Sequence, residues 1–263
     1  MKWAILLPLL VADCGGSAPD AAPPTDETLQ RETNAGRLAF ELERDEEAVA
    51  RFRAALARAQ ERDDPDAISN TGFDLAVAEL RANAPHQALA DARATRMEIE
   101  RRGAKPFPAL WLAEATALYR IGELADADRL AQLIQHGDDA EAAARATFLR
   151  GRIADDRGDV KGLATAAGAL NATDTASFAA DSAELGARLA LRGGDATGAQ
   201  HEAARAAELR QATLDYRGLA RALAIEGTAV QREGDKAAAA VKNTAASETM
   251  NARFAMRLIR VAW

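Results

Sequence analysis

The stretch Gly194-Asp195-Ala196-Thr197-Gly198-Ala199 decides the fold, because it combines a helix stop with a helix start. Glycine tolerates the left-handed backbone conformation that commonly ends a helix. An aspartate directly after it accepts hydrogen bonds from the free backbone N–H groups of the next helix. The stretch therefore predicts a tight turn between two helices.

The same turn motif, a glycine followed by an acidic residue, recurs along the chain at nearly regular intervals. Gly158-Asp159 and Gly234-Asp235 repeat it, and Gly122-Glu123 is a variant of it. Asparagine is the next best residue for the left-handed turn, and proline suits a first helical turn, so Asn83-Ala84-Pro85 is a fifth copy. Glu43-Arg44-Asp45 is the sixth and least regular copy. Six helix–turn–helix pairs are therefore expected.

Small or apolar residues recur in register with these turns. Those in the second helix of each pair are spaced by 40, 39, 36, 36 and 40 residues, and they are Ala48, Ala88, Ala127, Leu163, Ala199 and Ala239. Twelve residues before each lies a small residue: Gly36, Ala76, Ala115, Gly151, Ala187 and Gly227. Small residues at both places allow the two helices of a pair to approach closely.

This pattern resembles the tetratricopeptide repeat family, whose usual period is about 34 residues. The resemblance covers residues 29–249 and implies an all-α α-solenoid of about six repeats. Such arrays need terminal caps, and residues 250–263 are expected to form a C-terminal capping helix with Met250, Phe254 and Leu258 on one face. The alternative is an alanine-rich helical bundle without a superhelix.

The N-terminal residues are typical of an export signal. A short apolar run from Trp3 to Ala12 follows Lys2, and it is too short to span a bilayer. The residues Leu10-Val11-Ala12-Asp13-Cys14 resemble the lipobox of bacterial lipoproteins, although Asp13 replaces the usual small residue. The resemblance implies a signal peptide at 1–13 and a lipidated Cys14. Residues 14–28 then form a flexible tether. The alternatives are a buried first helix and a free thiol in a cytosolic protein.

Composition and motifs argue against catalysis and nucleic-acid binding. The formal net charge is −7, whereas phosphate binding needs clustered basic surface. The three histidines, His86, His136 and His201, share no metal-ligand spacing. No phosphate-binding glycine motif and no nucleophile turn is present. We therefore expect no enzyme activity, no metal and no cofactor.

The resemblance also implies a binding surface, since the first helices of tetratricopeptide arrays line the concave side. The register selects as partner-binding candidates Phe40, Phe73, Val77, Leu80, Leu112, Tyr119, Phe148, Arg152 and Arg188. Aromatic side chains beside arginine are typical of protein interfaces. The alternative is that these residues pack against the neighbouring repeat.

Two functions remain open at this point. The first is a non-catalytic periplasmic scaffold, anchored to the outer membrane by acyl chains, that holds a peptide or a subunit of an envelope assembly or transport machine. The second is a carrier or receptor for a hydrophobic small molecule such as a lipid. The partner is accordingly a protein or peptide in the cell envelope, or a lipid-like ligand, and not a nucleic acid.

Overall fold

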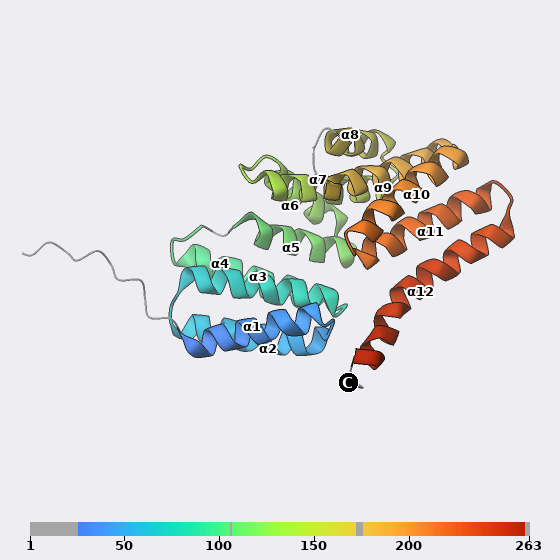
Figure 1. Ribbon diagram of the computed structural model, residues 1–263. Coiled ribbons are helices and arrows are strands. Elements are labelled where there is room, and N and C mark those ends of the chain that lie inside the picture. Colours follow the sequence, from blue (N-terminus) through green and yellow to red (C-terminus); the bar gives the residue numbers. More distant parts are fainter. Residues whose placement is uncertain (1–25, 106, 172–175, 261–263) are drawn as a thin grey trace, which may run out of the picture.

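A computed structural model describes residues 26–105, 107–171 and 176–260, and these segments form helices and short connections (Figure 1). The described residues contain twelve helices and no strand. The helices are α1 Glu27–Glu41, α2 Asp45–Glu61, α3 Pro65–Arg81, α4 Pro85–Arg101, α5 Pro108–Arg120, α6 Leu124–Gln135, α7 Ala140–Arg157, α8 Val160–Asn171, α9 Ala176–Gly193, α10 Ala196–Ala212, α11 Tyr216–Arg232 and α12 Lys236–Arg260.

The helices stack in chain order, which makes the array a solenoid. Each helix packs against the next one along the chain, and α3, α5, α7, α9 and α11 also contact one another in succession. These odd-numbered helices therefore form one layer. Arg217 of α11 donates a hydrogen bond of 2.7 Å to the backbone carbonyl of Arg81 of α3. Because the array curves enough to bring α11 to α3, the odd-numbered layer is the inner face.

The six predicted turns are confirmed. Each has its pivotal residue at positive φ, from 59° to 96°, and these residues are Glu43, Asn83, Gly122, Gly158, Gly194 and Gly234. The aspartates after three of the glycines cap the next helix: Asp159 accepts from the Gly162 backbone N–H, Asp195 from that of Gly198, and Asp235 from that of Ala238.

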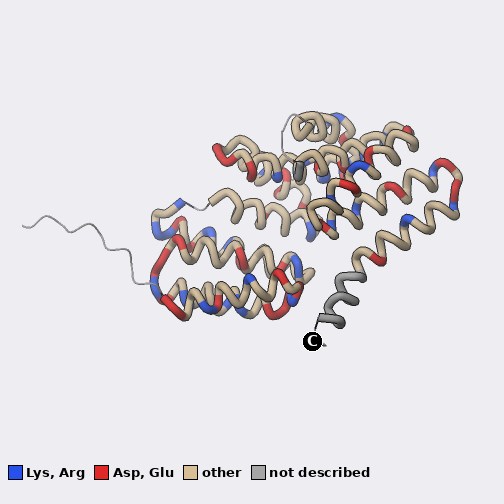
Figure 2. Tube along the Cα trace, in the orientation of Figure 1, with Lys and Arg blue, Asp and Glu red and all other residues tan. Residues whose placement is uncertain are grey.

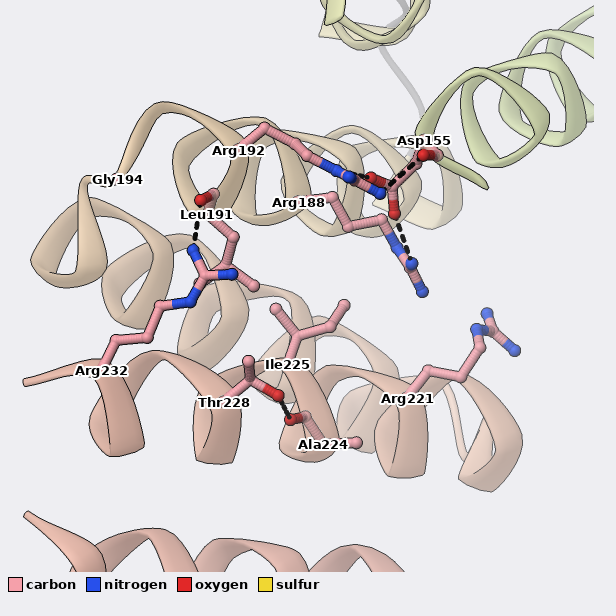
Figure 3. Close-up of a pocket in the computed structure, with 10 residues that line it drawn as sticks. All are labelled: Asp155, Arg188, Leu191, Arg192, Gly194, Arg221, Ala224, Ile225, Thr228 and Arg232. Atoms are coloured by element: carbon pink, nitrogen blue, oxygen red, sulfur yellow. Dashed lines mark hydrogen bonds and ion pairs between the residues drawn. The ribbon is translucent and has the colours of Figure 1, made fainter. Parts of the chain in front are cut away.

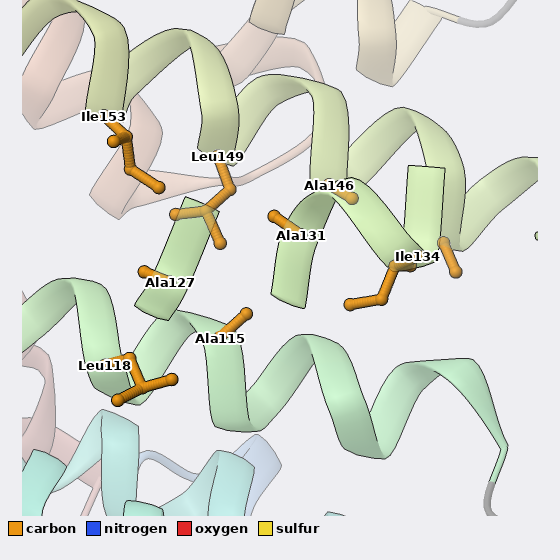
Figure 4. Packing of buried hydrophobic residues seen from close by; sticks show 9 residues of the cluster. Ala115, Leu118, Ala127, Ala131, Ile134, Ala146, Leu149 and Ile153 are labelled. Atoms are coloured by element: carbon orange, nitrogen blue, oxygen red, sulfur yellow. The ribbon is translucent and has the colours of Figure 1, made fainter. Parts of the chain in front are cut away.

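The seam within each pair is built from the small residues that the register predicts. Ala76, Ala88, Ala115 and Ala127 are fully buried. A Cβ on Gly151 of α7 would lie 3.0 Å from Ala166 Cβ of α8, its partner helix, and 2.4 Å from Leu185 Cδ1 of α9, so there is no room for a side chain at this position. Figure 4 shows the central core, in which Ala115, Ala127, Ala131 and Ala146 pack around Leu118, Ile134, Leu149 and Ile153.

The ends of the array differ from the expected boundaries. Helix α1 begins at Glu27, so the end of the segment expected as a tether, 14–28, is helical. Asp26 caps α1 and also accepts hydrogen bonds from Arg58 and Arg62. The separate capping helix expected at 250–263 is not a separate element, because α12 runs unbroken from Lys236 to Arg260. No glycine or proline interrupts that stretch, so nothing ends the helix at residue 250.

The expected signal peptide at 1–13 and Cys14 lie outside the described residues. Among the helices that are described, none combines the length and the apolar character that crossing a bilayer requires.

Candidate functional site: an arginine cluster on the inner face

Charged side chains gather where α7, α9 and α11 meet on the inner face. Helix α9 carries Asp181, Glu184, Arg188 and Arg192 at spacings of three and four residues, which places them along one side of the helix. We call the inner cluster the set formed by these four residues with Arg152 and Asp155 of α7, Arg210 of α10 and Arg221 of α11.

Glu184 is the centre of the inner cluster and is fully buried. Its carboxylate accepts hydrogen bonds from Arg221 Nε at 3.1 Å and from Arg188 Nη2 at 3.2 Å. Burial by itself raises the pKa of Glu184, but the charge and hydrogen bond of Arg221 and the charges of Arg188 and Arg152 outweigh burial and lower it. Glu184 therefore stays ionised and orders the arginines around it.

The other two acids of the cluster also have partners. Asp155 accepts from Arg188 Nη1 at 3.0 Å and from Arg192 Nε at 2.7 Å. Asp181 pairs with Arg210, a side chain that is itself buried. Burial raises the pKa of Asp181, and the charge and hydrogen bond of Arg210 counteract this. Each buried carboxylate thus has at least one guanidinium bound to it.

Two aromatic rings complete the inner face beside the cluster. The guanidinium of Arg152 lies over the Tyr119 ring, 4.7 Å from its centroid. Three guanidinium groups lie about the Phe148 ring at 5.9–6.0 Å, and they belong to Arg152, Arg210 and Arg221. The Tyr119 hydroxyl donates to Asp156 at 2.7 Å. Guanidinium groups stacked on aromatic rings are held in place without losing their in-plane hydrogen-bond donors.

A cavity of about 680 Å³ opens beside the cluster, between α9 and α11 (Figure 3). Four arginines and one carboxylate line it, together with Leu191, Gly194, Ala224, Ile225 and Thr228. The arginines are Arg188, Arg192, Arg221 and Arg232, and the carboxylate is Asp155. Figure 2 shows acidic and basic residues spread over both halves of the array, so this basic lining is a local feature of a chain whose net charge is −7. A cavity with this lining favours an anionic group.

The structure brings together four of the nine residues that the sequence selected. Tyr119, Phe148, Arg152 and Arg188 all belong to the inner face around the cluster. Val77 is a half-buried residue of α3 and does not line the cavity beside the inner cluster.

The remaining four candidates take part in packing. Phe40 lies under the guanidinium of Arg81, 3.8 Å from its ring centroid. The Phe73 ring makes an edge-to-face contact with Phe107, with 5.3 Å between the centroids. Leu80 is a core residue, only 8% exposed, and Leu112 packs against the central core cluster. Leu80 therefore does not present a contact surface, because its position on α3 points toward Ala88 and Ala117.

Four further site residues were not among the candidates selected from the sequence, and they are Arg192, Arg210, Arg221 and Arg232. Arg192 follows the candidate Arg188 by four residues, so it lies on the same helix face one turn further along. Arg221 is three residues before Ala224, which lines the same cavity. Arg210 belongs to an even-numbered helix, and no pattern on the inner helices indicates it.

No group of three or more histidine, cysteine, aspartate or glutamate side chains that could hold a metal ion occurs in the part of the chain that the structure describes.

Comparison with known proteins identifies the fold. No protein-family model matches the chain, and no curated protein matches it by sequence. Among solved structures, the chain is similar to the apo form of the quorum sensor NprR from B. thuringiensis, with a TM-score of 0.63 and 10% sequence identity. The match covers 89% of this chain and 70% of that chain. The twelve stacked helices and this likeness define an all-α solenoid of tetratricopeptide-like repeats.

Proposed function

We propose that this protein is a non-catalytic scaffold that holds a peptide or a segment of a protein partner on its inner face. One observation carries the proposal: the odd-numbered helices form a continuous inner layer in which guanidinium groups line a cavity of about 680 Å³. The Tyr119 and Phe148 rings lie beside the same arginine cluster. Stacked aromatics and arginines are the residues that dominate the binding energy of protein interfaces. The likeness to a quorum sensor is compatible with a ligand-binding role.

The inner face is less suited to carrying a lipid than to holding a peptide. The cavity has four arginines in its wall, and desolvating guanidinium groups against an acyl chain costs free energy without compensation. Nothing in the described residues favours a hydrophobic small molecule over a peptide.

Site-specific photo-crosslinking in the native host tests the scaffold. A photo-reactive residue at Thr228, an exposed residue of the cavity wall, should yield a discrete crosslinked partner. The matched control is the same residue at Met97 of α4, which is 62% exposed on an even-numbered helix. The same partner captured with equal yield at Met97 would overturn the inner face as the binding surface.

We further propose that the scaffold acts at the periplasmic face of the outer membrane, anchored through Cys14, within an envelope assembly or transport machine. The lipobox-like residues 10–14 and the apolar run before them support this location. Two or more acyl chains give stable anchoring, where one is marginal. Mass analysis of the membrane-extracted protein should show an acylated Cys14 as the first residue, and Cys14→Ser should release the protein from the membrane. An intact Met1 on an unanchored protein would overturn the anchor and leave the scaffold proposal untouched.

A further inference from the structure

One guanidinium of the inner cluster lacks a counter-ion. Arg152 forms no hydrogen bond or ion pair with any residue that the structure describes, and its Nε is buried. Its guanidinium group instead stacks on the rings of Tyr119 and Phe148. Every other arginine of the cluster has at least one carboxylate partner.

The acids nearby cannot serve Arg152, because other arginines already occupy them. Glu184 is held by Arg188 and by both Nε and Nη2 of Arg221. Asp155 is held by Arg188 and Arg192. The inner cluster holds five arginines and three carboxylates, so positive charge is in excess, and Arg152 is the arginine without an ion pair among the described residues.

A partly buried cation without a partner is costly for the fold. Burial and the positive charges of Arg221 and Arg188 lower the pKa of Arg152, with Tyr119 and Glu184 acting in the opposite direction. A buried polar group without a hydrogen bond destabilises the folded state. The Nε atoms of Arg188 and Arg210 are also buried without a hydrogen-bond partner. Arg188 lines the open basic cavity, so unpaired donors in this cluster fit a ligand that supplies acceptors.

The chemistry of the ligand follows from the geometry of the donors. Arg188 and Arg221 line the cavity, and both act electrostatically on Arg152. A guanidinium group is planar and pairs with a carboxylate through two parallel hydrogen bonds. Phosphate pairs with guanidinium groups in the same way, but the negative charges of an unmodified peptide or protein segment are carboxylates. The three arginines therefore suit a carboxylate.

We propose that Arg152, with Arg188 and Arg221, binds a carboxylate of the peptide or protein segment that the inner face holds. The carboxylate belongs to the chain end of the partner or to an acidic side chain. This assignment deepens the proposed function and rests on it for the nature of the partner. The binding site itself is a property of the inner cluster and is measurable with small probes.

The experiment uses the full chain and the side-chain Nε–H signals of its arginines in NMR. The probes are acetyl-triglycine with a free carboxylate, its C-terminal amide, acetyl-aspartate diamide and inorganic phosphate, at constant ionic strength. Loss of one signal in Arg152→Met identifies the Arg152 resonance. We expect acetyl-triglycine or acetyl-aspartate diamide to shift this resonance at least about tenfold more than the amide does, since the amide lacks the charge that strengthens hydrogen bonds. The more effective of the two carboxylates tells whether a chain end or a side chain is preferred.

Arg150→Met is the matched control on the same helix. Arg150 has partners, because its Nε donates to Asp128 at 2.8 Å and its Nη1 to Gln135. Arg150→Met should leave the response of Arg152 unchanged and lower Tm. Arg152→Met should keep or raise Tm in the absence of ligand, because it removes an unpaired charge and retains an apolar stem.

Three results would overturn the carboxylate site. They are an Arg152 resonance that responds equally to the acid and the amide, a response to phosphate at a tenfold lower concentration than to either carboxylate, and a clear fall in Tm in Arg152→Met. None of these results contradicts the proposed scaffold function if the photo-reactive residue at Thr228 still captures a partner. Conversely, a carboxylate response without any capture at Thr228 would overturn the scaffold and retain the site.

Discussion

At the scale of single residues, the buried charges of this protein differ in how well they are neutralised. Glu184 has several guanidinium partners and is ionised, whereas Glu79 of α3 has one good partner. Arg53 Nη2 donates to Glu79 Oε1 at 2.6 Å, but Oε2 is buried without a hydrogen bond. Burial, with the hydrogen bond and charge of Asp91, raises the pKa of Glu79 to about 8, and Arg53 only partly counteracts this. Glu79 therefore binds a proton near neutral pH in the folded state.

The variant Glu79→Gln tests this assignment through the pH dependence of stability. The folded-state pKa lies above the unfolded value, so the folded state retains a proton that the unfolded state loses. The free energy of unfolding of the natural protein should therefore fall, relative to Glu79→Gln, as pH rises from about 4.5 to about 8, by at least about 1 kcal/mol. Urea denaturation at about pH 5.5, 7 and 8.5 measures the difference between the two proteins.

Glu32→Gln is the control with the opposite sign. A hydrogen bond from Arg51 lowers the pKa of Glu32, so its contribution is present above the unfolded pKa and is lost only as pH falls below it. The stability difference for Glu32→Gln should be flat across the same series. A flat difference for Glu79→Gln as well would show that Glu79 is ionised throughout.

Phe73 is the residue whose role the structure changes most. Its ring contacts Phe107 edge to face and packs against the cluster that contains Ile68 and Leu110. Phe73→Ala should lower the free energy of unfolding by about 2 kcal/mol, because it removes a partly buried ring and its aromatic contact. Phe73→Leu should recover more than half of the loss in urea denaturation. Unchanged stability in Phe73→Ala would show that the Phe73 ring does not contribute to packing and is free to contact a partner.

At the scale of the elements, the turns are decided by backbone conformation and the seams by side-chain size. Gly194 has φ +80°, and a Cβ there would meet nothing within 4 Å. The constraint at Gly194 is therefore conformational. Gly186 lies inside α9, and a Cβ there would meet Glu202 Cγ at 3.7 Å, an ordinary contact. The two glycines thus predict opposite responses to substitution.

Gly194→Val should lower the free energy of unfolding by about 1–2 kcal/mol, because a β-branched residue is strained in the left-handed region. Gly186→Ala should raise it by about 0.5–1 kcal/mol, because alanine restricts the unfolded chain and favours the helix. Thermal denaturation followed by the helical signal compares the two.

Gly193→Ala is the adjacent control for the turn. Gly193 is the last residue of α9, is not among the residues at positive φ, and has open space around it. Its substitution should leave Tm unchanged or raise it slightly. If Gly193→Ala and Gly194→Val lowered Tm equally, the left-handed turn would not be the cause.

At the scale of the whole molecule, most of the stabilising contacts join near neighbours in the sequence. Helix α9 packs against α7, α8, α10 and α11, whereas α12 packs only against α11 among the described helices. The hydrogen bond from Arg217 to Arg81 is an exception, because it joins residues 136 positions apart. Solenoid stability is close to a sum of repeat and neighbour terms, so protection should vary along the array.

Hydrogen exchange measured by mass spectrometry tests this gradient. Peptides from α9 should exchange more slowly than peptides from the residues 236–250 of α12, because opening α9 disrupts contacts with four helices. Denaturant in small amounts should accelerate α12 first. Uniform exchange across α9 and α12 would indicate a single cooperative unit instead of a stack of repeats.

The sequence by itself determined the helical pairs of this protein. Turn residues such as Gly194 and Asn83 and the spaced small residues such as Ala76 and Ala88 are local signals. They act through backbone conformation and through close approach between helices that are neighbours in the sequence. Both effects can therefore be predicted from the order of residues alone. Because the repeats stack in sequence order, the same signals also predicted which helices pair, and the solenoid follows from them.

Only the tertiary structure decided which inner residues are free and which are packed. Leu80 and Phe73 occupy positions that the repeat register directs inward, but the close stacking of adjacent pairs covers them with Ala117 and Phe107. The register selected Arg152 and Arg188 but not the pairing within the inner cluster. Arg152, Glu184 and Arg221 lie on three different helices and meet because α7, α9 and α11 pack in succession in the inner layer. The charge state and the pairing of each guanidinium depend on that meeting, since Coulomb interactions and burial act through space and not along the chain.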